Sequence, residues 1–417
     1  MSRRRLQRRG QGAASLLALA LSALLLATGC IPPESVMPVY LTWSRVDTTS
    51  SITVQYHTRG PSQGSHVHYD REPRGGDPAA YAQHAEGFEK RRPGVDRTVH
   101  VVELSGLEPG GTYWFVVGDP VSGYREERSF RLPSRDGRLT FVAGGDMGTG
   151  FLSRMISARA AAESPSFAAI GGDLAYAYGA NKHLDRWWRW FADWEASMRT
   201  PEGHLVPMVL AVGNHELRDD SGSFPPEERG PFYRFFFQQG EDGASYFERR
   251  VGPVVLWVLD SGHLASHTEQ RAWLDQRFRI NSRVPFRFAV YHVPLYPAHH
   301  DFEARASQRG REHWLPLFDR FRLTAGFENH DHLQKRTHSL RAGQVVGEDE
   351  GTLYLGGGLW GKGHPEEPET QPYLARTLRR RHFWRVTLEG NEVRYTAIGA
   401  DGQVLDTAVQ RVGRRGS

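Results

Sequence analysis

Five short segments rich in Gly, Asp, Asn and His recur along this 417-residue chain, each at the end of an apolar run. They occupy residues 144–148, 172–176, 213–216, 289–292 and 329–332. Because the carboxyl ends of parallel strands meet at one edge of an open α/β sheet, segments that come directly after strands are brought together in space. The pattern therefore predicts a layered α/β fold in which five loops form one polar site.

The regions around these segments alternate between two kinds of secondary structure. Expected strands at 139–143, 167–170 and 206–212 alternate with expected helices at 153–162, 183–198 and 268–278. Alternation of this kind favours sheets covered by helices. From Phe383 onward the chain returns to strand-like alternation, so we expect the α/β domain to occupy residues 138–412.

The region before residue 135 shows a different pattern of expected secondary structure. Residues 51–56, 99–104 and 112–117 read as short strands, and turn-forming residues separate them. Strands at this spacing are typical of an all-β sandwich of the immunoglobulin or fibronectin type III kind. We therefore expect a β-sandwich domain at residues 36–135, joined to the α/β domain by Asp136 and Gly137.

The first thirty residues have the layout of an export signal. A basic stretch with five arginines precedes an apolar run from residue 13 to residue 27, which is too short to span a membrane comfortably. We expect a signal peptide at residues 1–30 and an exported protein, periplasmic or at the cell surface. Without these five arginines the formal net charge of +4 falls to −1, which argues against nucleic acid as a partner of the whole surface.

Cys30 is the only cysteine of the chain and stands just after the apolar run. In the order Leu-Ala-Thr-Gly-Cys it resembles a bacterial lipobox, whose thiol is lipidated, although the leucine is one position further away than usual. The alternative is a cysteine that is discarded with the signal peptide. The Ser-Arg-Arg-Arg-Leu stretch from residue 2 resembles a twin-arginine signal, or else an ordinary basic region. Membrane contact is therefore expected only through a lipid on Cys30.

The residue types in the five segments suit transition-metal binding. Asp and Asn offer hard oxygen atoms and His offers imidazole nitrogens, a combination that binds divalent or trivalent ions. The glycines let the backbone turn sharply at each strand end. Taken singly, a Gly-Asp pair after a strand is commonly a turn, and a lone His is commonly a structural residue with satisfied hydrogen bonds. Five such segments at strand ends indicate a metal centre instead.

The order of the motifs is Asp, Gly-Asp-x-x-Tyr, Gly-Asn-His-Glu, His and His-x-His. This order resembles the signature of the metallophosphoesterases of the calcineurin-like superfamily, and the tyrosine resembles that of purple acid phosphatases. Plant-like members of that family also place a fibronectin-like domain before the catalytic one, so the resemblance covers nearly all of the chain after the signal. Two positions depart from the family pattern: Asn329 stands in place of Gly and Ala289 in place of Val.

The resemblance implies a dinuclear centre that contains Fe(III) and a divalent Zn, Fe or Mn ion. The implied ligands are Asp146, Tyr176 and His332 for the ferric ion, Asn214, His292 and His330 for the divalent ion, and Asp173 as the bridge. A ferric ion carries enough charge to hold a phenolate that otherwise stays protonated near pH 7. A bridging carboxylate holds two cations roughly 3.5–4 Å apart, the separation used in two-metal catalysis.

The activity implied by the resemblance is hydrolysis of phosphate monoesters, in which metal-bound hydroxide attacks phosphorus in line. In the family pattern His215 contacts the substrate, while His299 and His300 orient the phosphate and protonate the leaving group. Glu216 is expected to support His215. The Gly- and Pro-rich segment 356–372 is expected to border the site.

Two other functions stay open at this point. A phosphodiesterase or nucleotide hydrolase would use the same metals. A catalytically inactive surface-binding protein would be expected to lack metal ligands, and all seven ligand positions of the family pattern are filled here. The partner expected is a phosphate ester, and the sequence does not indicate an oligomeric state.

Overall fold

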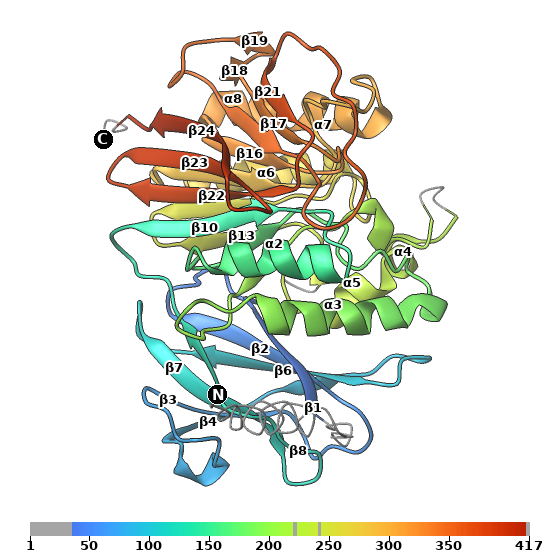
Figure 1. Cartoon of the computed structure of the whole chain (residues 1–417), viewed down its shortest axis with the longest axis vertical. Coiled ribbons are helices and arrows are strands. Elements are labelled where there is room, and N and C mark those ends of the chain that lie inside the picture. The colour runs from blue at the N-terminus through green and yellow to red at the C-terminus, as the bar shows by residue number, and fades with distance from the viewer. Residues whose placement is uncertain (1–35, 220–222, 241–242, 414–417) are drawn as a thin grey trace, which may run out of the picture. The chain divides into compact units, whose positions relative to one another are not determined.

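The computed structural model describes residues 36–219, 223–240 and 243–413, so the expected signal peptide and Cys30 lie outside the described residues. Two β-sheets, here called the N-terminal sandwich, come first (Figure 1). One has the strand order β1-β2-β6-β5, with β1 at Val36–Thr42, β2 at Ser51–Thr58, β5 at Phe88–Lys90 and β6 at Thr98–Ser105. The other has the order β4-β3-β7-β8, and β9 also pairs with β7. Its strands are β3 at His66–Asp70, β4 at Gln83–Glu86, β7 at Thr112–Asp119, β8 at Gly123–Tyr124 and β9 at Arg128–Arg131.

Strand β2 is buried on both faces, although alternation in a strand commonly signals one solvated face. Ile52 and Val54 belong to the hydrophobic core of the sandwich. On the other face, the Gln55 side-chain oxygen accepts a hydrogen bond of 2.9 Å from the backbone N–H of Gln238, and the His57 ring packs 4.7 Å from that of Phe191. The outer face of β2 is therefore covered by the α/β part of the chain.

Two larger sheets form the α/β part. The six-stranded sheet has the order β12-β11-β10-β22-β23-β24. Named in that order, its strands occupy Met208–Leu210, Ala168–Ile170, Leu139–Gly144, His382–Glu389, Glu392–Gly399 and Val404–Arg411. The seven-stranded sheet has the order β13-β14-β15-β16-β20-β17-β21. Named in that order, its strands occupy Phe247–Val251, Val254–Val258, Phe286–Val290, Ala325–Glu328, Leu353–Gly356, Gln334–Thr337 and Leu374–Leu378. A small ribbon pairs β18 at Leu340–Arg341 with β19 at Gln344–Val345. Strands β10, β11 and β12 are parallel, as are β14, β15, β16 and β20.

The two large sheets pack face to face through apolar side chains. The ring of Phe141 on β10 lies 5.5 Å from that of Phe288 on β15 and 5.7 Å from that of Phe327 on β16. Aromatic pairs at such distances add to the free energy of burial. Because parallel strands run side by side in both sheets, their carboxyl ends lie at one edge of the stack.

Helices cover the outer faces. They are α2 at Phe151–Ala161, α3 at Leu184–Ser197, α4 at Pro226–Arg229, α5 at Pro231–Phe236, α6 at His267–Ile280, α7 at Arg305–His313 and α8 at Leu315–Phe321. Three short 3₁₀ helices are η1 at Pro78–Ala80, η2 at Asn181–His183 and η3 at Asn214–Glu216. The expected helices and strands of the α/β part are confirmed, with ends shifted by at most two residues.

Helix α6 shows why these segments are helical. Ser266 caps it, since its side-chain oxygen accepts the N–H of Glu269, and Glu269 also places a negative charge in the first turn. Arg277 and Arg279 place positive charges in the last turn, where they oppose the helix dipole. The buried side chains of Leu274 and Phe278, four residues apart, attach one face of the helix to the core under the seven-stranded sheet.

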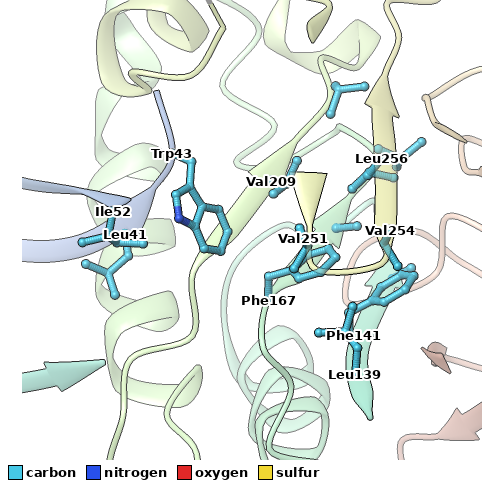
Figure 2. Close-up of a cluster of buried hydrophobic side chains, with 14 of the residues drawn as sticks. Leu41, Trp43, Ile52, Leu139, Phe141, Phe167, Val209, Val251, Val254 and Leu256 are labelled. Carbon is cyan, nitrogen blue, oxygen red and sulfur yellow. The ribbon is translucent and has the colours of Figure 1, made fainter. Parts of the chain in front are cut away.

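The N-terminal sandwich and the α/β part share one hydrophobic core. Figure 2 shows Trp43 between Leu41 and Ile52 on one side and Phe167 and Val209 on the other. The rings of Trp43 and Phe167 are 6.4 Å apart, and both side chains are buried. Truncating such a buried ring to alanine typically costs about 3–5 kcal/mol of stability.

The expected fold class, an all-β sandwich followed by layered α/β sheets, is confirmed. The domain boundaries at 36–135 and 138–412 stay predictions, because a core cluster runs through both parts. Among the described residues, no helix has both the length and the apolar character that crossing a membrane requires.

Candidate metal centre

The five polar segments meet at the carboxyl ends of five strands, as the sequence predicts. These strands are β10, β11 and β12 of one sheet and β15 and β16 of the other. Six of the seven ligand candidates come within four residues of the end of a strand: Asp146 after Gly144, Asp173 after Ile170, Asn214 after Leu210, His292 after Val290, and His330 and His332 after Glu328. Tyr176 comes six residues after Ile170. The site therefore lies where loops from both sheets converge.

His292 carries the clearest sign of a cation site. Its Nδ1–H donates to the carbonyl oxygen of Gly171 at 2.9 Å, so Nε2 of the neutral ring carries a lone pair. That nitrogen lies 2.8 Å from Oδ1 of Asn214 and 3.5 Å from Oδ1 of Asp173. Burial and neighbouring histidines hold the pKa of His292 well below its usual range, which disfavours a second ring proton. The lone pairs of these three atoms repel one another, and a cation bound to them removes that repulsion.

A second group of potential ligands surrounds Asp146. Its Oδ1 lies 3.1 Å from Nε2 of His332 and 3.3 Å from the phenolic oxygen of Tyr176. Burial, together with the carboxylates of Asp146 and Asp173, raises the pKa of Tyr176, so the phenol keeps its proton unless a strong cation displaces it. Oxygen donors around one imidazole suit a hard, highly charged metal ion.

Asp173 contributes to the first group, and its charge also acts on the second. Its carboxyl group belongs, with His292 and His330, to a set of three potential ligand atoms that all lie within 4.8 Å of one another. Burial, Asp146 and Glu216 raise the pKa of Asp173 well above its ordinary value. Two carboxylates held together in a buried site repel each other, and cations between them relieve that repulsion.

The backbone at the ligand positions is strained. Asp146, Asp173, Tyr176 and His330 have φ angles of 57°, 54°, 56° and 72°. Left-handed backbone costs a non-glycine residue roughly 1–2 kcal/mol. Strain of this kind persists where surrounding contacts impose it, commonly at functional sites.

Asn329, one of the two departures from the family pattern, fits its place. Its side-chain Nδ2 donates to the carbonyl oxygen of Tyr291 at 3.0 Å, next to His292. A Cβ on Gly171 would overlap the Asn329 amide, so the glycine makes room for the larger side chain. The amide therefore joins the segment of His330 to that of His292.

Glu216 acts through the backbone. Its buried carboxylate accepts hydrogen bonds of 2.8 Å from the N–H groups of Asp173 and Leu174 and of 2.9 Å from that of Gly213. Burial raises its pKa to about 7. Glu216 thus ties the Asp173 loop to its own loop, which also carries His215, and this extends the supporting role expected for it.

The structure brings His215 and His300 next to the ligands. The His215 ring lies 4.3 Å from that of Tyr176, its Nε2 lies 3.6 Å from Oδ2 of Asp173, and burial lowers its pKa to about 4. The His300 ring stacks on that of His330 at 4.2 Å. His299 lies at the rim, where its Nδ1 is 2.9 Å from the carbonyl oxygen of Glu367. The roles of these three histidines stay predictions.

Asp331 is a site residue that was not predicted. Its carboxylate accepts the backbone N–H groups of Ala298 and His300 at 2.6 and 3.2 Å and lies 2.6 Å from Nδ1 of His300. Burial opposes its ionisation, but the hydrogen bond from His300 and the charge of Lys335 outweigh burial and lower its pKa to about 2. The signal available in the sequence was its place between His330 and His332.

A buried ion pair between Lys335 and Glu328 lies next to the site. Nζ of Lys335 donates to Oε2 of Glu328 at 2.7 Å and to the carbonyl oxygen of Tyr296 at 2.5 Å. Oε1 of Glu328 accepts the Tyr291 hydroxyl at 2.9 Å and the Leu295 N–H at 2.7 Å. The pair therefore fixes the loop that comes after His292.

Segment 356–372 borders the centre, as expected. A Cβ on Gly358 would overlap the carboxylate of Asp146, so this glycine permits close approach of the loop. Nζ of Lys362 lies 5.5 Å from the centre of the Tyr176 ring, and Glu366 accepts the N–H of His332 at 2.8 Å.

A cleft of about 610 Å³ opens beside Asn214 and His330. Its lining also includes Arg229, Arg305 and Arg309 and, among the described residues, no Asp or Glu, so the cleft is basic. A positively charged cleft favours anionic molecules.

The chain is similar in sequence and fold to purple acid phosphatases. Residues 36–132 match the sequence family described as Purple acid Phosphatase, N-terminal domain. The chain is 25% identical over 258 residues to an uncharacterized protein of Mycobacterium tuberculosis, which is 53% of this chain and 46% of that protein. It is 24% identical over 325 residues to Purple acid phosphatase 13 of Arabidopsis thaliana, which is 66% of this chain and 57% of that protein. The chain thus spans about half the length of these curated relatives.

A solved structure shares the fold. The purple acid phosphatase PPD1 from seeds of yellow lupin (Lupinus luteus) matches 91% of this chain and 75% of its own, with a TM-score of 0.76 and 18% sequence identity. The resemblance drawn from the five motifs is confirmed, and it extends over both parts of the described chain.

Proposed function

We propose that this chain, which joins a purple acid phosphatase N-terminal domain to a metallophosphoesterase fold, hydrolyses phosphate monoesters at a two-metal centre. The observation that carries the proposal is the set of acceptor atoms around His292, whose Nε2 faces oxygens of Asn214 and Asp173. Such a set of oxygen and nitrogen atoms fits a bound metal cation.

The residues present fit two different metal ions. Asp146, Tyr176 and His332 would hold Fe(III), Asn214, His292 and His330 would hold Zn, Fe or Mn in the divalent state, and Asp173 would contact both. When bound, such ions supply a nucleophile at neutral pH and polarise the phosphoryl oxygens. The phenol of Tyr176 favours Fe(III) at its position, because a weaker cation would leave it protonated.

His215 and His300 supply the remaining chemistry. His215, with a pKa of about 4, is neutral at pH 7 and can donate one hydrogen bond to a phosphoryl oxygen. The hydrogen bond from His300 to Asp331 raises the pKa of His300, so this imidazole keeps a proton that it can transfer to the leaving oxygen.

The basic cleft favours a second candidate, a nucleotide or another substrate with charge beyond the reacting phosphate. Arg229, Arg305 and Arg309 line the same cleft as His330. Rates of hydrolysis of a simple monoester, a diester and a nucleotide at equal concentration separate these candidates. A strong preference for the diester would replace the monoesterase assignment.

The first test is a visible spectrum with metal analysis on the same sample. The wild type is expected to bind iron and a second metal ion at this centre and to show a ferric–phenolate absorption band. Tyr176→Phe is expected to lose the band, whereas Tyr178→Phe, whose ring packs against His215 as that of Tyr176 does, is expected to keep it. A colourless protein with two zinc or manganese ions would exclude Fe(III) and keep the phosphoesterase. A protein that binds no metal after supplementation would overturn the proposal in favour of a binding protein.

Export is part of the proposal. The signal-like segment and Cys30 predict a periplasmic or surface-bound protein with a lipid on Cys30. Mass spectrometry of the mature N-terminus tests this prediction, and an unmodified fragment that begins after Cys30 would contradict lipidation.

A further inference from the structure

A second cluster of potential metal ligands lies in the N-terminal sandwich. His66 on β3 and His84 and Glu86 on β4 each offer one ligand atom, and these atoms all lie within 4.8 Å of one another. The register pairs His66 with Glu86 and His68 with His84. Because side chains two residues apart on a strand share a face, the four side chains stand together on one face of the β3–β4 pair. Figure 1 shows β3 and β4 at the end of the sandwich away from α2 and α3.

The orientation of the His66 ring is set by its surroundings. Its Nε2 lies 2.9 Å from the carbonyl oxygen of Gln63, which only accepts, so Nε2 carries the proton and donates it. Nδ1 of the neutral ring therefore presents a lone pair. A Cβ on Gly64 would lie 2.8 Å from Nε2, and Gly64 has a φ of 103°, so a glycine is needed there for the ring to lie in this position. A histidine that donates one ring N–H to a backbone carbonyl is arranged as metal-ligating histidines are.

Without a metal, the Nδ1 lone pair of His66 accepts a hydrogen bond from the His84 ring, and the carboxylate of Glu86 lies close to both. Nδ1 of His66 lies 3.1 Å from Nε2 of His84 and 3.9 Å from Oε1 of Glu86. Ligand atoms around a tetrahedral zinc ion are about 3.3 Å apart, given bonds of about 2.0–2.1 Å. The two imidazoles are thus already at the separation that zinc needs, and the Glu86 side chain, which is 70% exposed, is free to move closer.

His68 completes the cluster without joining the ligands. Its ring stacks on that of His84, with centres 4.5 Å apart and planes inclined by 25°. The stack leaves Nε2 of His84 at 3.1 Å from Nδ1 of His66. His68 is therefore a matched control, because it is a histidine of the same cluster that lies outside the ligand set.

We propose that His66, His84 and Glu86 form a zinc site that joins the edge strand β4 to β3. Two imidazoles and one carboxylate form a known ligand set for zinc, and a water molecule completes the tetrahedron. Strand β4 ends its sheet on this side, and an edge strand that pairs with one neighbour is held less firmly than a central one. A metal that bridges β4 and β3 adds a cross-strand link at this edge. The proposal does not depend on the phosphoesterase function.

The test counts zinc in the full chain. Wild type, His84→Asn, Glu86→Gln and His68→Asn are dialysed against the same concentration of free Zn²⁺, and bound zinc is measured per chain. All variants keep the residues of the first metal centre, so a difference from wild type reports the sandwich site alone. The expected result is one zinc ion fewer in His84→Asn and in Glu86→Gln, and no change in His68→Asn. Loss of one ligand is expected to weaken binding by about 100-fold or more, beyond the 10–100-fold typical of partners outside the ligand set.

A second readout covers the case in which His84→Asn alters folding. Added zinc is expected to raise the Tm of wild type and of His68→Asn by the same amount. The part of this rise that comes from the sandwich site is expected to be absent in Glu86→Gln, whose exposed side chain can be replaced without disturbing the core. Equal zinc content in wild type and both ligand variants would overturn the proposal. Loss of zinc in His68→Asn as well would overturn the assigned ligand set.

Discussion

Nδ1 of His300 lies 2.6 Å from Oδ1 of Asp331, and the His300 ring stacks on the ligand candidate His330 at 4.2 Å. The carboxylate thus holds a proton on Nδ1 and fixes the ring beside the centre. This relationship makes His300 the strongest candidate for the proton donor to the leaving oxygen, and its partner Asp331 a positioning residue.

The variant His300→Asn is expected to lower kcat on an alkyl phosphate by about 100-fold, the lower range for general acid catalysis. The loss on p-nitrophenyl phosphate is expected to be much smaller, because an aryl leaving group departs without a proton. Steady-state kinetics on both substrates measures the difference. His299→Asn is the control, since that side chain lies at the rim and is expected to lower both rates alike, if at all. Equal losses on both substrates in His300→Asn would exclude the acid role.

The variant Asp331→Asn is expected to shift the pH dependence of the same reaction. Asp331 raises the pKa of His300, so without its charge His300 loses its proton at a lower pH. The alkaline limb of the kcat profile is therefore expected to move to lower pH, while the acidic limb stays in place. A uniform loss of rate with an unchanged profile would mean that Asp331 only stabilises the loop.

Removing the charge of Asp173 is expected to stabilise the metal-free chain. The pKa of Asp173 is raised by burial, Asp146 and Glu216, so the folded state holds its proton more tightly than the unfolded state. That destabilisation is absent below the unfolded pKa and grows as pH rises, by about 1.4 kcal/mol for each pKa unit. Metal-free Asp173→Asn is thus expected to have a higher Tm than metal-free wild type at pH 7, with a smaller difference near pH 4. Adding metal is expected to reverse the order, and differential scanning calorimetry with and without chelator measures both.

Burial makes His100 a source of acid sensitivity in the sandwich. Its ring nitrogens contact the hydroxyls of Thr58 and Ser65 at 2.8 and 2.9 Å, and burial lowers its pKa to about 4 from 6.5. Between these pH values the unfolded state binds more protons, so the free energy of unfolding falls as pH falls, by about 3 kcal/mol in all.

The variant His100→Gln keeps side-chain hydrogen bonding but does not titrate. It is expected to lose less stability than wild type between pH 6.5 and 4, and urea unfolding across this range measures the two slopes. Parallel slopes for the two proteins would show that folding does not lower the pKa of His100.

Most ligand positions could be predicted from sequence because they stand within four residues of the end of a strand. Asp146 and His292 need a local strand and turn, and the sheet then brings them together. The His300–Asp331 contact could not be predicted in this way, since it depends on how two loops 31 residues apart fold over each other. The burial of Gln55 and His57 on the outer face of β2 depends likewise on packing against distant helices.

The cluster around His66 shows a different limit. Its members are spread over 21 positions of the chain, and nothing in their spacing indicates a shared face. Only the register of β3 with β4 brings them together. Residues that meet across strands are invisible until the pairing is known, because a shift by one residue would send each side chain to the other face.

Because Trp43 and Phe167 belong to one core, the N-terminal sandwich and the α/β part cannot be separated without exposing it. A domain that folds by itself has a largely polar surface where it meets its neighbour. Neither half of this chain has such a surface, because both contribute apolar side chains to the shared core. The Tyr40 hydroxyl donates to the carbonyl of Phe236 at 2.6 Å, and the guanidinium of Arg249 donates to the carbonyl of Trp43. Separating the chain at residue 135 would therefore break these hydrogen bonds and expose apolar rings to water. The first β-strands therefore cover one face of the α/β part, and moving the α/β part with its candidate metal centre into another protein would require keeping these strands with it.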